Sequence, residues 1–71
     1  MKKVFAKDLK FKRTNQNEEY CELELNGYSL EIGHNLNTNY YWLKNKTTNS
    51  DIPFETLRSL IIWINKMPER R

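Results

Sequence analysis

The chain contains few of the residues that build covalent or metal-bound sites. Its 71 residues include one cysteine, one histidine, two glycines and two prolines. Cys21 has no second cysteine with which to form an internal disulfide, and one histidine cannot complete a zinc site of the usual Cys/His kind. Two separated glycines, Gly27 and Gly33, do not form a glycine-rich phosphate loop. We therefore expect no metal, no cofactor and a reducing, cytoplasmic compartment.

Long apolar segments are also missing. The longest uninterrupted apolar run is Leu60–Ile64, five residues, whereas a membrane-spanning helix needs about 20. The N-terminal lysines are not followed by an apolar stretch of signal-peptide length. A chain of this length removes only roughly 60% of its unfolded surface from water on folding. We therefore expect one small domain over residues 1–71, with a thin two-layer core and no large enclosed active site.

The clearest structural pattern lies in the first half of the chain. Two alternating runs, approximately 19–25 and 28–33, are joined by Asn26-Gly27. Asn-Gly favours a two-residue type I′ turn, because both central residues need a positive φ, and the pattern predicts a β-hairpin. The turn predicts three cross-strand pairs on one face: Leu25 with Tyr28, Leu23 with Leu30 and Cys21 with Ile32. The opposite face carries Glu22, Glu24, Ser29 and Glu31.

Two further strands are expected, one on each side of the hairpin. Leu9 and Phe11 alternate with lysines, which predicts a strand within approximately 3–13, and 40–46 has strand composition. In 40–46, Tyr41 and Leu43 share one face, and the other face carries Tyr40, Trp42, Lys44 and Lys46. The pattern does not decide which face is inward. The polar segments 14–18, 33–39 and 47–51 are expected to be loops.

A helix is expected at the C-terminal end, over approximately 53–66. Pro53 is tolerated in a first helical turn, and Pro68 follows the predicted end. Apolar residues recur at helical spacing and form one stripe: Phe54, Leu57, Leu60, Ile61 and Ile64. Residues 67–71 are expected to form a tail. The sequence thus predicts an α+β fold, a four-stranded antiparallel meander sheet with one C-terminal helix packed on one face.

Charge is distributed unevenly along the chain. Residues 1–13 hold six Lys or Arg and one Asp, whereas 14–33 hold five Glu and no basic residue. In neighbouring strands these charges would pair on the exposed face, with Lys10 and Lys12 near the hairpin glutamates and Lys44 or Lys46 near Glu31. One interpretation is therefore a self-complementary ladder of surface charges.

A second interpretation is an aromatic and basic surface for nucleic acid. Bases stack on exposed rings and lysines follow the phosphates, so a single strand can bind such a surface without a sequence code. The acidic hairpin opposes this if it shares the face. Binding of single-stranded nucleic acid is our leading expectation, and its candidate residues are Lys10, Lys12, Arg13, Tyr40, Trp42, Lys44 and Lys46.

The expected element order resembles that of a family of small dimeric single-stranded-DNA-binding domains, the positive-cofactor-four type. The resemblance covers residues 4–66 and lies in the hairpin about Asn26-Gly27 and in Ser50–Glu55, which is expected to open the helix. It implies a curved sheet that grips a single strand. No residue motif of the family is matched, so no functional residue is transferred.

The alternative is a protein-interaction module, or a small inhibitor of the kind that a phage or mobile element encodes. Ile62 lies among polar residues of the predicted helix, beside Trp63, and aromatic anchors dominate interfaces. These two residues could also form the seam of a homodimer. The candidate residues for this alternative are Glu22, Glu24, Glu31, Ile62 and Trp63. No catalytic residue is expected, because His34 falls in a predicted loop without a nearby nucleophile.

Overall fold

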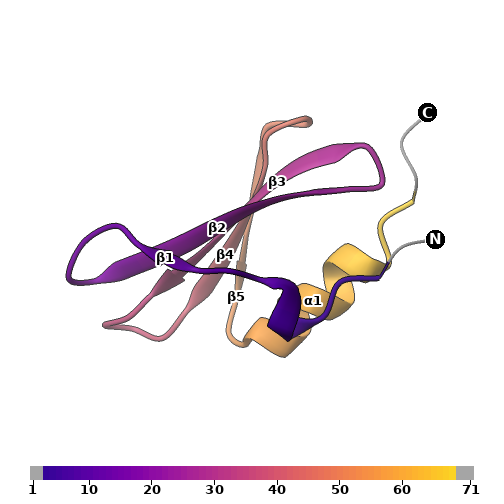
Figure 1. The fold of residues 1–71 in the computed structure, drawn as a ribbon. Helices are drawn as coiled ribbons and strands as arrows, with labels where there is room; N and C mark the ends of the chain where they lie inside the picture. Colours follow the sequence, from indigo (N-terminus) through magenta and orange to yellow (C-terminus); the bar gives the residue numbers. More distant parts are fainter. Residues whose placement is uncertain (1–2, 69–71) are drawn as a thin grey trace.

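The computed structural model describes residues 3–68 and shows an α+β fold (Figure 1). Five antiparallel strands form one sheet in the order β1-β2-β3-β4-β5, so each strand pairs with its neighbours in sequence. One helix follows the last strand and lies against β4, β5 and the short N-terminal 3-10 turn η1. The elements are η1 (Ala6–Asp8), β1 (Lys12–Arg13), β2 (Glu18–Leu25), β3 (Tyr28–Asn35), β4 (Tyr41–Asn45), β5 (Ser50–Phe54) and α1 (Leu57–Asn65).

The central hairpin forms as its turn sequence predicts. Asn26 and Gly27 have φ angles of 53° and 87°, both in the left-handed region that a type I′ turn requires. The register is the predicted one, with Leu25 opposite Tyr28, and Leu23 opposite Leu30 in the next pair on the same face. Each strand is eight residues long. The predicted second hairpin strand, 28–33, therefore continues for two residues, and His34 lies in β3 instead of a loop.

The core lies between the helix side of the sheet and α1. Leu30 and Ile32 of β3 are completely buried, as are Leu60 and Ile64 of the helix. Leu43 is 2% exposed and faces Ile32 across the β3–β4 pair. This settles the inward face of the fourth strand, so Trp42 and Lys44 lie on the face away from the helix, which we call the open face.

Asparagine side chains and backbones shape most of the turns. Asn15, Asn35 and Asn45 each accept a hydrogen bond through the side-chain oxygen from the backbone N–H two residues later, at 2.8–3.0 Å. Asn39 and Asn49 have φ angles of 61° and 59°. Both behaviours are ones that asparagine adopts at low cost. The abundance of asparagine therefore has a local structural role in this fold.

The prediction of a first strand over approximately 3–13 is wrong for most of its length. Only Lys12–Arg13 pairs as a strand, and a 3-10 turn at Ala6–Asp8 interrupts the segment. The Phe5 N–H donates to the Asp8 carboxylate at 2.9 Å and stabilises that turn. Of the two alternating apolar residues, Leu9 belongs with Val4 to the buried cluster, and Phe11 packs against this cluster.

A side-chain amide ties the N-terminal segment to the helix. The Val4 N–H donates to Asn65 Oδ1 at 2.8 Å, and Asn65 Nδ2 donates to the Val4 carbonyl at 2.9 Å. The Asn65 amide thus pairs with the backbone as a neighbouring strand would. This segment is held against α1 instead of lying along β2, so the first strand begins only at Lys12.

The structure also corrects the C-terminal half, because a fifth strand forms where the sequence predicts a loop and the start of the helix. Ser50–Phe54 pairs with β4, and the edge position tolerates Pro53, which has no N–H to donate. The helix begins at Leu57, since the Thr56 hydroxyl accepts a hydrogen bond from the Ser59 N–H at 3.1 Å and caps it. The observed helix is therefore shorter than the predicted 53–66. Of the predicted tail, residues 69–71 lie outside the described residues.

The buried thiol of Cys21 is expected to react slowly while the protein is folded. Burial raises the pKa of this thiol to about 11, from 9.0, and the charge of Glu19 adds to the rise. Near pH 8 the thiolate is then about 100-fold scarcer than in the unfolded chain. Alkylation by iodoacetamide, followed by mass spectrometry, should be slower by that factor in native protein than in denaturant. Equal rates would contradict the burial of Cys21.

The raised pKa of Cys21 also determines how the free energy of unfolding changes with pH. The unfolded thiol loses its proton near pH 9, whereas the folded thiol keeps it to about 11. The folded state therefore binds more protons between these values, and the contribution of Cys21 to the free energy of unfolding falls as the pH rises through them.

Candidate binding surface on the open sheet face

A row of paired residues crosses the open face near its centre. In register, Tyr20 of β2 pairs with Gly33 of β3, which pairs with Trp42 of β4. A Cβ atom at Gly33 would lie 1.8 Å from Trp42 Cε2, so the indole ring occupies the space that any larger residue would fill. Trp42 therefore lies directly on the backbone of β3, an arrangement in which an aromatic ring covers a glycine on the neighbouring strand.

The aromatic row forms part of a shallow, solvent-open pocket of about 350 Å³. We call it the open-face pocket, and its lining residues are Thr14, Glu18, Tyr20, Glu22, Glu31 and Trp42. The lining combines two aromatic rings with three carboxylates. Rings and carboxylates together attract a cation, because the ring face is electron-rich and the carboxylates are negatively charged.

One lysine of the chain already contacts two of these carboxylates. Lys46 Nζ lies 2.6 Å from Glu22 Oε2 and 3.4 Å from Glu31 Oε2. The hydrogen bond to Glu22 raises the pKa of the Lys46 ammonium, desolvation lowers it, and Glu31 raises it further. Glu22 and Glu31 stand directly opposite each other in the β2–β3 pair, so the lysine also reduces their mutual repulsion. The ladder of paired charges is thus present at this position.

The balance of charge on the open face is acidic although the chain as a whole has a net charge of +3. Following the strand register, the residues on this face include five carboxylates, on Glu18, Glu22, Glu24, Glu31 and Asp51. The lysines on the same face are Lys12, Lys44 and Lys46. The excess of basic residues therefore lies elsewhere on the molecule.

The structure distributes the predicted nucleic-acid-binding residues over different places. Lys12, Trp42 and Lys44 share the open face, and Lys46 reaches it just after β4. Lys12 faces Tyr20 instead of a hairpin glutamate.

The other three lie elsewhere. Lys10 is exposed before β1, and Tyr40 is 50% exposed before β4. Arg13 pairs with Glu19 on the helix side of the sheet, and its guanidinium donates to the carbonyls of Asn15 and Gln16 at 3.3 and 3.0 Å.

The residues of the alternative surface fall into two separate groups. Glu22, Glu24 and Glu31 lie on the open face. Ile62 and Trp63 lie on the helix, on the other side of the sheet, and are 45% and 49% exposed. These two groups cannot contact one compact ligand together.

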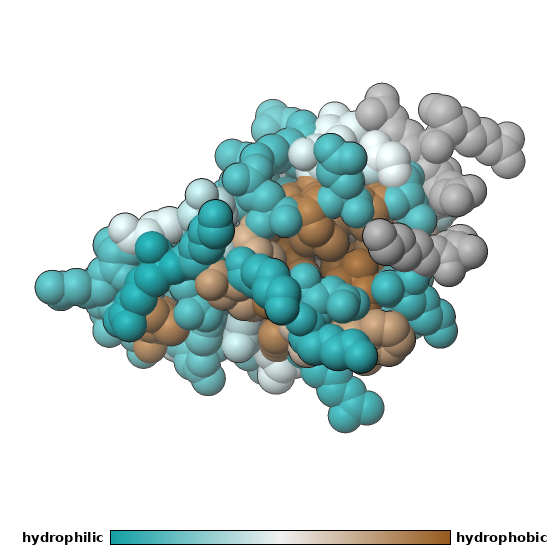
Figure 2. All heavy atoms as spheres, viewed as in Figure 1, coloured by the Kyte–Doolittle hydropathy of each residue, from teal (hydrophilic) through white to brown (hydrophobic). Residues whose placement is uncertain are grey.

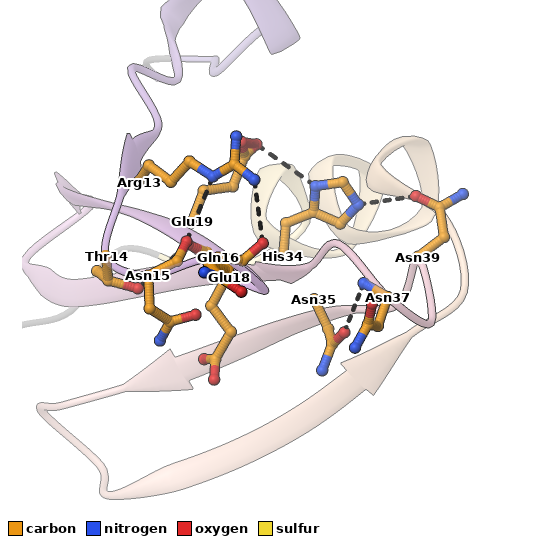
Figure 3. Close-up of polar contacts among 10 residues, drawn as sticks. All are labelled: Arg13, Thr14, Asn15, Gln16, Glu18, Glu19, His34, Asn35, Asn37 and Asn39. Carbon is orange, nitrogen blue, oxygen red and sulfur yellow. Dashed lines mark hydrogen bonds and ion pairs between the residues drawn. The ribbon is translucent and has the colours of Figure 1, made fainter.

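A polar cluster occupies the helix side of the sheet beyond the end of the core (Figure 3). The ring of His34 stacks on Tyr41 with centroids 4.1 Å apart. Its Nδ1 lies 3.4 Å from Glu19 Oε2, and its Nε2 lies 2.8 Å from Asn39 Oδ1. Within residues 3–68, the hydrogen-bonding partners of this ring are a carboxylate and an amide. The cluster joins β2, β3 and the β3–β4 loop, a structural role.

Three residues of the open-face pocket were not predicted from the sequence, namely Thr14, Glu18 and Tyr20. The close contact between Gly33 and Trp42 was not predicted either. Tyr20 alternates with Glu22 and could have been assigned to the polar face of the hairpin. Gly33 lies near an aromatic strand in sequence, and a glycine within a strand often marks a close approach. Its contact with Trp42 depends on the β3–β4 register, which the sequence does not specify.

No family model matches this chain, and neither a curated protein nor a solved structure matches it significantly. The resemblance in element order to single-stranded-DNA-binding domains is thus without support from these comparisons, and the fifth strand departs from it. The structure described for residues 3–68 contains no helix long and apolar enough to span a membrane. The same residues contain no group of three or more side chains of His, Cys, Asp or Glu placed to hold a metal ion.

Proposed function

We propose that this chain is a non-enzymatic protein-interaction domain whose open-face pocket receives a lysine or arginine side chain of its partner. The observation that carries the proposal is the combination of Tyr20 and Trp42 with three carboxylates in one pocket. Cation–π contacts contribute about 0.5–2 kcal/mol each, the larger values applying where the pair is desolvated. The domain would act by covering a surface of its partner, as an adaptor or a small inhibitor does.

The electrostatics of the open face support a cationic partner over a phosphate backbone. Glu22 and Glu31 already hold the ammonium group of Lys46. Glu18 adds a third carboxylate to the same pocket. A nucleotide that stacked its base on Trp42 would bring its negatively charged phosphate close to these carboxylates, which would repel it. A lysine or arginine side chain would instead be attracted to them.

Binding of single-stranded nucleic acid is the second candidate function. It is favoured by the position of Trp42, whose indole ring covers Gly33 and is partly exposed, as a base-stacking platform must be. Lys44 follows two residues along the same strand face and could contact a phosphate. In this candidate the acidic side of the pocket would lie outside the path of the strand.

A fluorescence titration separates the two candidates. In a Trp63→Phe background Trp42 is the only tryptophan, so its emission reports on the open-face pocket. We expect pentaarginine to change this emission and a short oligothymidylate to have little effect at the same ionic strength. Replacing Glu31 by Gln should weaken pentaarginine binding several-fold. Changing Trp42 to Ala, followed by calorimetry, should weaken it about 2- to 30-fold, the factor that corresponds to the cation–π energy.

A matched control is the change of Trp63 to Ala, because this exposed tryptophan lies on the helix and should leave peptide affinity unchanged. Tighter binding of the oligonucleotide than of the peptide, weakened by Lys44→Glu and by added salt, would overturn the first candidate in favour of the second. If neither ligand changes the emission of Trp42, both uses of the pocket are wrong.

A further inference from the structure

Part of the edge of β2 has no neighbouring strand within the described residues. β1 pairs only with Glu19 and Tyr20, so the second half of β2 extends beyond it. In an antiparallel hairpin with a two-residue turn, the residues that flank the turn, Leu25 and Tyr28, exchange backbone hydrogen bonds with each other. Counting back from Glu24, every second residue of β2 therefore turns its N–H and C=O groups away from β3. Glu22 and Glu24 therefore present their backbone groups at this edge. None of the backbone hydrogen bonds in loops, turns and caps of residues 3–68 uses them.

A groove runs along this free edge. The N-terminal segment runs from η1, beside the helix, to the short β1, and it pairs with β2 only there (Figure 1). The groove has a volume of about 270 Å³ and is lined by Lys3, Val4, Asp8, Leu9, Leu23, Glu24 and Leu25. Figure 2 shows apolar side chains gathered on this face between the hairpin and the N-terminal segment. The groove thus combines an apolar floor with unpaired strand backbone.

We propose that the free edge of β2 accepts an extended segment of another protein as an added antiparallel strand. Strand addition is a common mode of peptide recognition, in which the main chain supplies affinity and alternate side chains supply specificity. The free stretch Glu22–Leu25 is about 13 Å long at 3.3 Å per residue, which suits a segment of four or five residues.

Charge complementarity defines the occupant. Side chains of an added strand that lie opposite Glu22 and Glu24 share the open face with them, so these positions favour lysine or arginine. The alternate positions of the added strand point to the helix side of the sheet, where Leu23 is partly buried. These positions therefore favour apolar residues. The partner segment therefore alternates basic and apolar residues. A second copy of this chain would instead bring its own glutamates against Glu22 and Glu24, which disfavours self-pairing.

This inference goes beyond the proposed function, because it concerns a different surface and does not require Trp42. Glu24 distinguishes the two surfaces, since it lines the β2 groove and is not part of the open-face pocket. It is also exposed, so changing its charge should not unfold the domain.

The test uses an acetylated and amidated peptide, Lys-Val-Lys-Val-Lys, added to labelled full-length protein and followed by NMR. We expect shifts in the amide resonances of Glu22–Leu25 and slower hydrogen exchange at the amides of Glu22 and Glu24. In the proposed pairing the lysine N–H groups face β2 and the valine N–H groups face solvent. N-methylation of the central lysine amide should weaken binding at least about tenfold. N-methylation of a valine amide is the matched control and should leave the affinity within about twofold.

Reversal of the charge at position 24 provides an independent test of strand addition. Glu24→Lys should abolish the shifts that the lysine peptide causes at Glu22–Leu25 and allow Glu-Val-Glu-Val-Glu to cause shifts there, while the control Glu55→Lys should change neither. Equal affinity of the peptide N-methylated at lysine, or the absence of shifts at millimolar peptide, would overturn the proposal. So would concentration-dependent shifts of Glu22–Leu25 without peptide, which would identify a second copy as the occupant. Shifts confined to Tyr20 and Trp42 would overturn strand addition and leave the proposed function standing.

Discussion

Replacing Ile64 by alanine is expected to lower the free energy of unfolding by about 2–5 kcal/mol. Ile64 is completely buried between α1 and the sheet, and alanine would leave a cavity that the neighbouring side chains fill only in part. Domains of this size have little stability to lose, so a change at the upper end of this range could leave the domain largely unfolded at room temperature. Urea denaturation followed by circular dichroism measures the effect.

Ile62 provides the matched control for this experiment. It is the same residue type in the same helix, two positions away, but it is 45% exposed. Ile62→Ala should change the free energy of unfolding by no more than about 0.5 kcal/mol, because surface substitutions that break no specific contact are close to neutral. Similar losses for both variants would mean that the helix packs on the sheet with a different face.

Replacing Gly33 by alanine is expected to have the second-largest effect, a loss of about 1–3 kcal/mol in the free energy of unfolding. The added methyl group would overlap the ring of Trp42, with Cβ to Cε2 at 1.8 Å, so the indole must leave its position on β3. The open-face pocket would lose its aromatic floor at the same time. Thermal or urea denaturation, together with the near-ultraviolet circular dichroism of tryptophan, reports both consequences.

A double-mutant cycle shows whether Trp42 causes this loss. In a Trp42→Ala background the space above Gly33 is empty, and alanine is preferred to glycine in a strand by roughly 0.5–1 kcal/mol. Gly33→Ala should therefore be neutral or stabilising there, which gives a coupling energy of opposite sign to the single-variant loss. If Gly33→Ala is equally destabilising with and without the indole, the close contact between Gly33 and Trp42 is wrong.

The hairpin is the part of the fold that sequence reasoning could predict in detail. Its turn residues and its alternation act locally, and the two agree on one register. A shift of one residue would move Leu23 and Leu30 to the polar face, so the hydrophobic pattern itself selects the pairing. Most of the apolar stripe of the helix is predicted for a similar reason, since Leu60 and Ile64 follow helical spacing and are completely buried. Phe54, which was expected to begin this stripe, lies in β5 instead.

The segments that were predicted wrongly have patterns compatible with more than one structure. Ser50–Phe54 contains Pro53, which suits either the first turn of a helix or an edge strand. It becomes a strand through pairing with β4, and the cap at Thr56 then begins the helix later. In the N-terminal segment, alternating apolar residues suit a strand, but the amide of Asn65, distant in sequence, holds Val4 against the helix instead.

The candidate surfaces depend even more on the tertiary structure. The sequence contained the carboxylates, lysines and aromatic residues, but neither the place of Trp42 above Gly33 nor the exit of the N-terminal segment from the edge of β2 is encoded by neighbouring residues. Both arise from pairings between segments that lie far apart in the chain.

The β2–β3 hairpin, its register and most of the apolar stripe of the helix follow from the sequence, because turn preferences and hydrophobic periodicity act over a few neighbouring residues. Tertiary packing is needed to explain why five strands form, why Leu43 faces inward, and why the open face carries more carboxylates than lysines. It also explains why, within residues 3–68, part of the outer edge of β2 has no neighbouring strand. These features follow from which distant segments pack together, and local preferences do not select among such packings.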